Sequence, residues 1–257
     1  MALSTRAYLK SPAKKLACIV MPTYNEASNV RELLPRILDV AGSIPTHELH
    51  ILVVDDNSPD GTSSVVSEWT RRDPRIHLLR GEKAGLGEAY KRGITVALER
   101  LKPELIIQMD ADQQHDPCLL PLFVDLTRYG FTLVIGSRFA PGAGRPALSF
   151  PRRLISRIGT ILVRLAGGLP RLYDCTSGYR CITAELLAKC DLRPLATKGY
   201  SFQSSLLSEL IWHGARPVEI PIIFGPRAYG SSKLCLKDQV EFLTNLGLLW
   251  LRRIQVT

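Results

Sequence analysis

Residues 106–115 read Ile-Ile-Gln-Met-Asp-Ala-Asp-Gln-Gln-His. The apolar start is typical of a buried strand, and two aspartates one residue apart follow it directly. At the end of a strand, Asp110 and Asp112 can direct both carboxylates at one point, which is unfavourable unless a cation lies between them. Such hard oxygen ligands suit Mg²⁺ or Mn²⁺. Because Asp is also a common turn residue, an ordinary turn is the alternative interpretation.

The same pattern recurs through the first half of the chain. Apolar runs that stop at polar residues alternate with stretches of helical periodicity. This alternation predicts an α/β fold, with a mainly parallel, doubly wound sheet flanked by helices. The runs expected to form strands are 16–21, 50–54, 76–79, 104–109 and 131–135. Helices are expected from Asn25 onward, around 61–71 and over 88–101.

Polar side chains follow these strands, at the edge where open α/β sheets bind ligands. Besides 110–114, the candidate loops are 22–26, 55–62 and the segment Gly85-Leu86-Gly87. The carboxylates of the first two loops could accept hydrogen bonds from a base or a ribose, and glycine permits close approach of a ligand to the backbone. Each loop by itself is also an ordinary cap or turn. Together they predict a nucleotide-binding half that ends near residue 137.

Composition limits the kind of protein. A chain of 257 residues fits one large α/β domain or two small ones, and its formal net charge of +9 implies an anionic partner. Six cysteines are scattered without a CxxC pair, which indicates reduced core thiols and a cytosolic-facing protein. The basic N-terminus lacks an apolar region, so no secretory signal is expected. No run of about 18 uncharged apolar residues exists, so no transmembrane helix is expected either.

Arginine dominates the second half. Residues 138–180 contain eight arginines, no lysine and a single acid, Asp174. Helical periodicity over 152–166 places arginines opposite an apolar face made of Leu154, Ile155, Ile158, Ile161, Leu162 and Leu165. A second apolar stripe, over 240–253, ends in Arg252-Arg253. These helices either pack on the core or rest at a bilayer interface, where arginines meet lipid phosphates. The excess of arginine favours the interface, and the lack of a recognition motif argues against nucleic acid.

The ordered motifs resemble those of one family. From about Leu16 to Phe242 the chain is similar to the inverting glycosyltransferases of family 2 with the GT-A fold, and among them to the dolichol- or polyprenol-phosphate mannose synthases. Motifs shared widely in the family are 22–26 (PTYNE), 54–62 (VDDNSPDGT) and 110–115 (DADQQH). Those typical of the lipid-phosphate group are 136–138 (GSR), 152–156 (RRLIS), 174–180 (DCTSGYR), 199–203 (GYSFQ) and 230–234 (GSSKL).

This resemblance implies roles for individual residues. It places Asp112, Arg138 and Arg227 at the reacting centre. The nucleotide sugar would contact Pro22, Tyr24, Glu26, Asp55, Asp56, Ala111 and Lys233, and a divalent metal would bind Asp110, Asp112 and Gln114. The acceptor phosphate would bind Arg138, Arg152 and Ser156, because a guanidinium matches phosphate oxygens. The segment Ser231-Ser232-Lys233 resembles a loop that closes over the site. His115 is expected to be structural.

The resemblance also implies a reaction. The donor would be GDP-mannose, the cofactor Mg²⁺ or Mn²⁺, and the acceptor a polyprenyl or dolichyl phosphate at the cytosolic face of a membrane, where anchoring subunits could assist. Ser205 and Pro226 depart from the family pattern, so another donor such as UDP-glucose stays open. A catalytically inactive nucleotide-sugar-binding partner of a membrane enzyme is the alternative from another class. The expected domains are a basic arm (1–15), a catalytic domain (16–237, divided at 137/138) and a C-terminal amphipathic helix (238–257).

Overall fold

One seven-stranded sheet organises the protein. The computed structural model describes residues 13–144, 150–193, 195, 201–225 and 236–256, with the backbone alone at 150–152, 236–240 and 256. In sheet order the strands are β3 (Ile76–Arg80), β2 (His47–Asp55), β1 (Lys15–Thr23), β4 (Leu105–Gln108), β6 (Arg180–Thr183), β5 (Leu133–Ser137) and β7 (Pro217–Pro221). All neighbours are parallel except β6, which runs antiparallel to both β4 and β5. The predicted mainly parallel sheet is confirmed.

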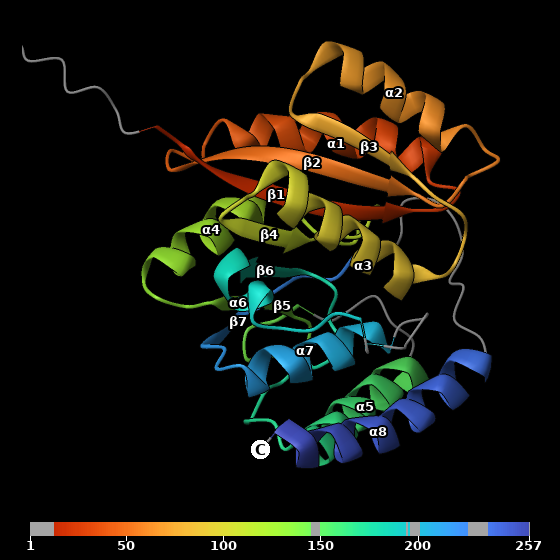
Figure 1. The fold of residues 1–257 in the computed structure, drawn as a ribbon, viewed down its shortest axis with the longest axis vertical. Helices are drawn as coiled ribbons and strands as arrows, with labels where there is room; N and C mark the ends of the chain where they lie inside the picture. Colours follow the sequence, from red (N-terminus) through yellow and green to blue (C-terminus); the bar gives the residue numbers. More distant parts are fainter. Residues whose placement is uncertain (1–12, 145–149, 194, 196–200, 226–235, 257) are drawn as a thin grey trace, which may run out of the picture.

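The central strands are buried because helices cover both faces of the sheet. Residues Ala17 to Met21 of β1 are fully buried, as continuous apolar runs in parallel strands predict. One face carries α1 (Ala27–Ala41), α2 (Thr62–Arg72) and α4 (Leu120–Arg128). The other carries α3 (Leu86–Val96, extended by a π-helical turn over Ala97–Leu101), α6 (Ala184–Ala188) and α7 (Phe202–Trp212). Figure 1 shows these layers.

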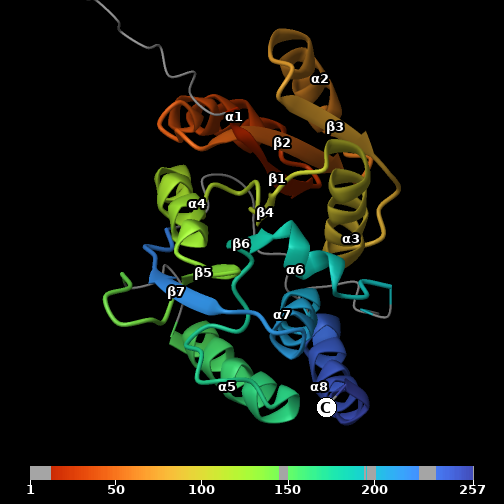
Figure 2. The same ribbon diagram turned by 60° about the vertical axis from the view of Figure 1, so that its left-hand side comes forward.

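Two long helices lie at one end of the molecule. In both views α5 (Phe150–Gly167) and α8 (Leu236–Val256) run side by side at the end opposite α1 and α2 (Figures 1 and 2). A Cβ at Gly159 of α5 would lie 3.4 Å from the ring of Phe242 in α8. Small residues on α5 thus allow the two helices to approach closely.

The apolar face predicted for α5 does not pack on the core. Gly159, Thr160 and Val163 face inward, whereas the large apolar side chains are exposed: Leu154, Ile155, Ile158, Ile161 and Leu165, the last to 69%. On α8 the buried Asn245 and Leu249 face inward and Trp250 is 54% exposed. The core-packing interpretation of these two helices is therefore wrong for most of their large apolar residues. Among the described helices, none is both long and apolar enough to cross a membrane.

Several elements of the second half were not predicted from the sequence. α7 is buried from Phe202 to Leu210, so it lacks the polar face that gives an amphipathic period. β6 has only four residues, and β7 begins and ends with proline, which disfavours a strand. The helix α6 is also short, and so is α4 of the first half, which was likewise not predicted. Short or uniformly buried elements give too little periodicity to be recognised.

Close packing of α3 on the sheet gives a first testable prediction. A Cβ at Gly93 would lie 2.5 Å from Cγ1 of Val20 and 2.7 Å from Cγ2 of Val54. Because both valines are stiff, Gly93→Val should lower the free energy of unfolding by about 3 kcal/mol. Urea denaturation of the purified protein measures this change.

The matched control is Gly247 in α8, where an added Cβ meets no atom within 4 Å. Gly247→Ala should raise the free energy of unfolding by about 0.5 kcal/mol, because alanine is the better helix former. Equal effects of the two substitutions would contradict the packing described for Gly93.

Candidate functional site

Two loops at the carboxyl ends of β1 and β2 are joined by the buried carboxylate of Asp55. Thr23 Oγ1 donates to Asp55 Oδ1 over 3.0 Å. The hydroxyls of Ser58 and Ser63 each donate to the same carboxylate over 2.6 Å. Both oxygens of Asp55 are thus engaged by the chain's own hydroxyl groups. The residue orders the loop and has no exposed surface for a ligand.

A second set of contacts fixes these loops to the start of α1. Asp60 accepts from the backbone N–H of Ala27 (3.0 Å) and from the hydroxyl of Thr62 (2.6 Å). Thr62 Oγ1 in turn accepts from the backbone N–H of Glu26 over 3.0 Å. The predicted nucleotide-binding segments 22–26 and 55–62 therefore form one hydrogen-bonded unit.

The side chains that line this unit carry both charges. Asp56 is 5% exposed, and its Oδ1 accepts from Arg92 Nη2 of α3 over 2.5 Å. Lys83 Nζ lies 3.6 Å from the centre of the Tyr24 ring. A Cβ at Gly81 would lie 2.5 Å from the Arg92 guanidinium carbon, so glycine leaves the space that Arg92 occupies. Pro22 lies buried in β1 behind this surface.

The loop after β4 holds the two aspartates. Tyr90 of α3 donates to Asp110 Oδ1 over 2.7 Å, and the backbone N–H of Asp110 donates to His115 Nδ1 over 3.0 Å. His115 stacks on Tyr179 at 4.7 Å, and burial lowers its pKa to about 4, so the imidazole is neutral. The structural role predicted for His115 is confirmed.

Gln113 fastens the same loop to α1. Its amide nitrogen donates to Asn29 (3.2 Å) and to Glu32 (3.0 Å), and its Oε1 accepts from Arg36 (3.2 Å). The backbone of Gln113 has a φ of 64°. Asn25 and Asn57, in the other two strand-end loops, also have positive φ. Uncommon conformations at non-glycine residues cluster at functional sites, and here they mark all three loops.

The donor set of this loop fits a hard divalent cation. Asp110 and Asp112 present carboxylates from one turn. Burial raises the pKa of the Tyr90 hydroxyl most, and the negative charges of both aspartates raise it further. Gln114 Nε2 donates to the carbonyl of Gly225 over 2.7 Å, which leaves Oε1 as its possible ligand atom. Ala111 is buried between the aspartates. Among the described residues no group of three or more His, Cys, Asp or Glu gathers, so diphosphate oxygens or water would complete the shell.

The segment before β6 lies beside these aspartates. A Cβ at Gly178 would lie 3.4 Å from Asp110 Oδ2 and 3.2 Å from Gln203 Nε2 of α7, so a larger residue would contact Asp110 and require a small shift of Gln203. Arg180 is fully buried, donates to the carbonyls of Gln203 and Cys175, and has its pKa lowered to about 10 by that burial. This buried cation lies close enough to Asp174 and Tyr90 to interact with them electrostatically.

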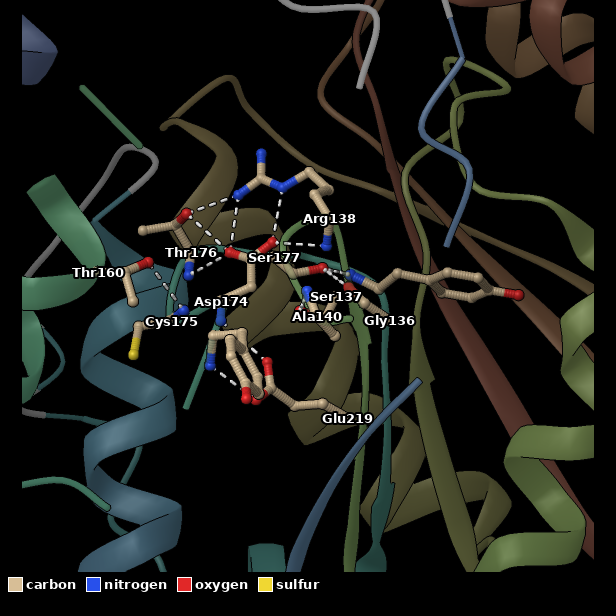
Figure 3. A network of polar contacts seen from close by, with 12 residues as sticks. Gly136, Ser137, Arg138, Ala140, Thr160, Asp174, Cys175, Thr176, Ser177 and Glu219 are labelled. Carbon is tan, nitrogen blue, oxygen red and sulfur yellow. Dashed lines mark hydrogen bonds and ion pairs between the residues drawn. The ribbon is translucent and has the colours of Figure 1, made fainter. Parts of the chain in front are cut away.

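Arg138 reaches the same place from the end of β5. Its guanidinium pairs with the buried Asp174, Nε to Oδ2 over 2.7 Å (Figure 3). It also lies close enough to Asp110 for that charge to raise its pKa. The structure thus brings Asp110, Asp112 and Arg138 together. Ser156 lies on α5, and the side chain of Arg152 is outside the described part, as are Arg227 and the segment 231–233.

Four residues of this site were missed by sequence reasoning or given no role. They are Tyr90, Arg92, Gln113 and Asp174, each of which orients a predicted site residue or its loop. Only Asp174 had a signal in the sequence, as the single acid among eight arginines. Ser205, which departs from the family pattern, is buried and donates to Asn245 of α8 over 2.8 Å.

The fold matches that of known sugar-transferring enzymes. Glucosyl-3-phosphoglycerate synthase from Mycobacterium tuberculosis, solved with Mn²⁺ and UDP-glucose, superposes with a TM-score of 0.65 at 18% identity, over 94% of this chain and 79% of its own. Mannosyl-3-phosphoglycerate synthase from Rubrobacter xylanophilus gives a TM-score of 0.64 at 19% identity, over 94% and 73%. The architecture is therefore the GT-A fold.

A family model described as glycosyl transferase family 2 matches residues 18–187, so the chain belongs to this family of glycosyltransferases. The polyprenol monophosphomannose synthase of Mycolicibacterium smegmatis is 38% identical over 84% of this chain and 80% of its own length. The undecaprenyl-phosphate mannosyltransferase of Micrococcus luteus is 39% identical over 84% and 86%. The dolichol-phosphate mannosyltransferase of Pyrococcus furiosus is 32% identical over 89% of this chain and 62% of its own length.

The contact between Tyr90 and Asp110 gives a second prediction. Tyr90→Phe removes the hydroxyl that donates to a carboxylate, so it should lower the free energy of unfolding by about 2 kcal/mol. Chemical denaturation measures the loss. Tyr129 is 70% exposed, and Tyr129→Phe is the matched control that should change nothing measurable. A silent Tyr90→Phe would mean that the hydroxyl does not support Asp110.

Proposed function

We propose that the protein transfers mannose from GDP-mannose to a polyprenyl or dolichyl phosphate, with inversion at the anomeric carbon, to give a β-mannosyl phosphoryl lipid. The observation that carries this proposal is the similarity, at 38–39% identity over 84% of the chain, to two proteins named for mannosyl transfer to such lipids. The neighbouring positions of Asp110 and Arg138 support it, because one side chain suits a metal diphosphate and the other an anionic acceptor.

The donor nucleoside would bind between the loops after β1 and β2. Tyr24 offers a ring wall, and the carboxylates of Asp56 and Glu26 can accept hydrogen bonds from base N–H or ribose hydroxyl groups. Arg92 orients Asp56 through an ion pair, whereas Asp55 acts only by ordering the loop. Lys83, over Tyr24, is the cation placed to meet phosphate or base oxygens. Lys233 is proposed to contact the nucleotide sugar on the basis of the family resemblance alone.

Asp110, Asp112 and Gln114 would hold a divalent cation against the diphosphate, with Ala111 backing the turn between them. When bound, this cation supplies Lewis-acid stabilisation of the charge that develops on the departing GDP. The aspartates are thus ligands, and neither is assigned the role of a base. Tyr90 keeps Asp110 aimed at the site through its hydroxyl.

The acceptor needs little help from a general base. A phosphate monoester has its second ionisation near pH 6, so the attacking oxygen is already anionic at neutral pH, and about two charges must be neutralised. Arg138 lies at the site for this purpose. Arg152, Ser156 and Arg227 are proposed to complete the phosphate contacts on the resemblance. The protein's main task is then to hold two anions close enough to react.

We further propose that α5 and α8 rest on the cytosolic surface of a membrane. Their exposed large apolar side chains lie at one end of the molecule, where the helices run side by side (Figure 2). Burying such side chains in the interface is favourable, and arginines of α5 would meet lipid phosphates. The lipid acceptor must be met at such a surface, with or without anchoring subunits.

The proposed activity is tested with labelled sugar donors. Purified protein, Mg²⁺ or Mn²⁺ and polyprenyl phosphate should yield lipid-extractable label from GDP-mannose and not from UDP-glucose, and a chelator should abolish the transfer. Label transferred from UDP-glucose alone would mean that the donor is UDP-glucose and not GDP-mannose. Absence of transfer from either would favour a nucleotide-sugar-binding partner protein.

Two aspartate variants, one a test and one a control, check the metal assignment. Asp112→Asn should lower kcat/KM by about a hundredfold or more, because a direct ligand contributes at least as much as its supporting residues. The side chain of Asp125 on α4 is 46% exposed and, within the described part of the chain, its ion pair is with Arg128, so Asp125→Asn should retain wild-type activity. Full activity of Asp112→Asn would refute the assignment.

Membrane binding is tested by sedimentation with anionic vesicles. Ile161→Ser together with Leu165→Ser should weaken vesicle binding by about tenfold, because two exposed apolar side chains are lost from the interface. Leu122 on α4 is 42% exposed, and Leu122→Ser should have no effect. Equal losses in both proteins would argue against α5 as the docking helix.

A further inference from the structure

The guanidinium of Arg138 is held along one edge by a carboxylate. Nε donates to Asp174 Oδ2 over 2.7 Å and Nη2 to Asp174 Oδ1 over 2.8 Å. The Arg138 side chain is 12% exposed and that of Asp174 is fully buried. This two-point arrangement is the one in which arginine also grips a phosphate. The edge that would bind phosphate most firmly is therefore already in use.

Thr176 engages the other hydrogen of Nη2. Its hydroxyl oxygen accepts from Arg138 Nη2 over 2.6 Å, and its own proton goes to Asp174 Oδ1 over 3.1 Å. The backbone N–H of Arg138 donates to Asp174 Oδ2 over 3.1 Å. Among the described residues, no acceptor is found for Nη1. Of the guanidinium donors, Nη1 is the one left for a ligand.

The segment that carries Asp174 is itself fixed from three directions. Glu219 of β7 accepts from the backbone N–H of Tyr173 (2.7 Å) and of Asp174 (2.9 Å). The backbone N–H of Cys175 donates to Thr160 of α5 over 3.3 Å, and Ser177 donates to the carbonyl of Gly136 over 2.6 Å. Figure 3 shows these contacts around Asp174.

Both members of the pair stay charged. Burial alone would lower the pKa of Arg138, but the contact with Asp174 and the charge of Asp110 outweigh burial and raise it. Burial alone would raise the pKa of Asp174, but Arg138 and two backbone N–H groups outweigh it and lower that pKa. The pair is a permanent ion pair at neutral pH, and it lies near the predicted metal carboxylate.

We infer that Asp174 is a positioning residue for acceptor binding: it occupies the Nε–Nη2 edge of Arg138, so that the guanidinium presents Nη1 to the acceptor phosphate, and Glu219 fixes Asp174 in turn. This inference rests on the proposed function, in which Arg138 binds that phosphate. It also revises the expected geometry, because Arg138 then contacts the phosphate through one nitrogen and further contacts must come from other groups.

The test is a double-mutant cycle on the full-length protein, with Asp174→Asn, Arg138→Ala and the double variant. Asp174→Asn keeps the size of the side chain but turns one acceptor into a donor facing Arg138. It should raise KM for polyprenyl phosphate by about tenfold or more, since misplaced contacts cost that much, and leave KM for GDP-mannose within about twofold. Added to Arg138→Ala, it should cause no further rise. Equal rises in both KM values, or additive effects, would overturn the inference.

Two further variants distinguish a failure of the inference from a failure of Asp174→Asn to fold. If Asp174→Asn does not fold, Glu219→Gln replaces it and should raise KM for polyprenyl phosphate by about threefold in the same selective way, since it removes one acceptor behind Asp174. Glu185 on α6 is 85% exposed and, among the residues that the structure describes, its ion pair is with Lys189, so Glu185→Gln is the control without effect. An unchanged Glu219→Gln in a folded protein would count against the inference.

Calorimetry can measure the affinity of each variant for polyprenyl phosphate in detergent micelles. These affinities give the same double-mutant cycle without any need for catalytic turnover. Should the wild-type protein transfer no mannose, the proposed function fails. Weaker binding by Asp174→Asn would then still support the positioning role, and unchanged binding would refute it.

Discussion

The antiparallel insertion of β6 between β4 and β5 is the constraint on which the site depends. Because β6 runs against its neighbours, its amino end lies at the edge where β4 and β5 have their carboxyl ends. The register pairs Gln108 with Arg180, which brings the residues before Arg180 beside the Asp110 loop. Arg138 follows β5 at the same edge. Three segments far apart in the sequence are thus joined by the hydrogen bonds of one short strand.

This arrangement concentrates charge in a region with little water. Asp110, Asp112 and Asp174 carry negative charge, and Arg138 and Arg180 carry positive charge. Only Arg138 is paired directly with a carboxylate among the contacts described for these two arginines. Arg180 is held by carbonyl oxygens, at a cost that its lowered pKa reflects. The positive charges of Arg138 and Arg180 lie close enough to Asp110 and Asp174, respectively, to offset part of the negative charge gathered there.

The sequence predicted the fold of residues 16–137 well and that of the later residues only in outline. Strands such as 16–21 and 50–54 are long, apolar and followed by polar residues, so their position and burial could be deduced. The partners that orient the site could not. Tyr90, Arg92 and Glu219 meet Asp110, Asp56 and Asp174 across 20, 36 and 45 residues of chain. Such contacts depend on how elements distant in sequence pack together, and the contact of Glu219 depends on β7, a strand flanked by prolines that was not recognised.

The helix α5 illustrates a different limit, because its period was predicted but the choice between core and bilayer as the partner of its apolar face was left open. Apolar periodicity shows that one face of a helix is suited to an apolar environment, but it does not show whether protein or lipid provides that environment. Here the inward face consists of small residues that permit close helix contact, and the larger side chains face outward. In contact with a bilayer, α5 and α8 would bury those side chains without any change of backbone. The lipid would then stabilise the folded chain by mass action, and thermal stability would depend on the supply of membrane surface.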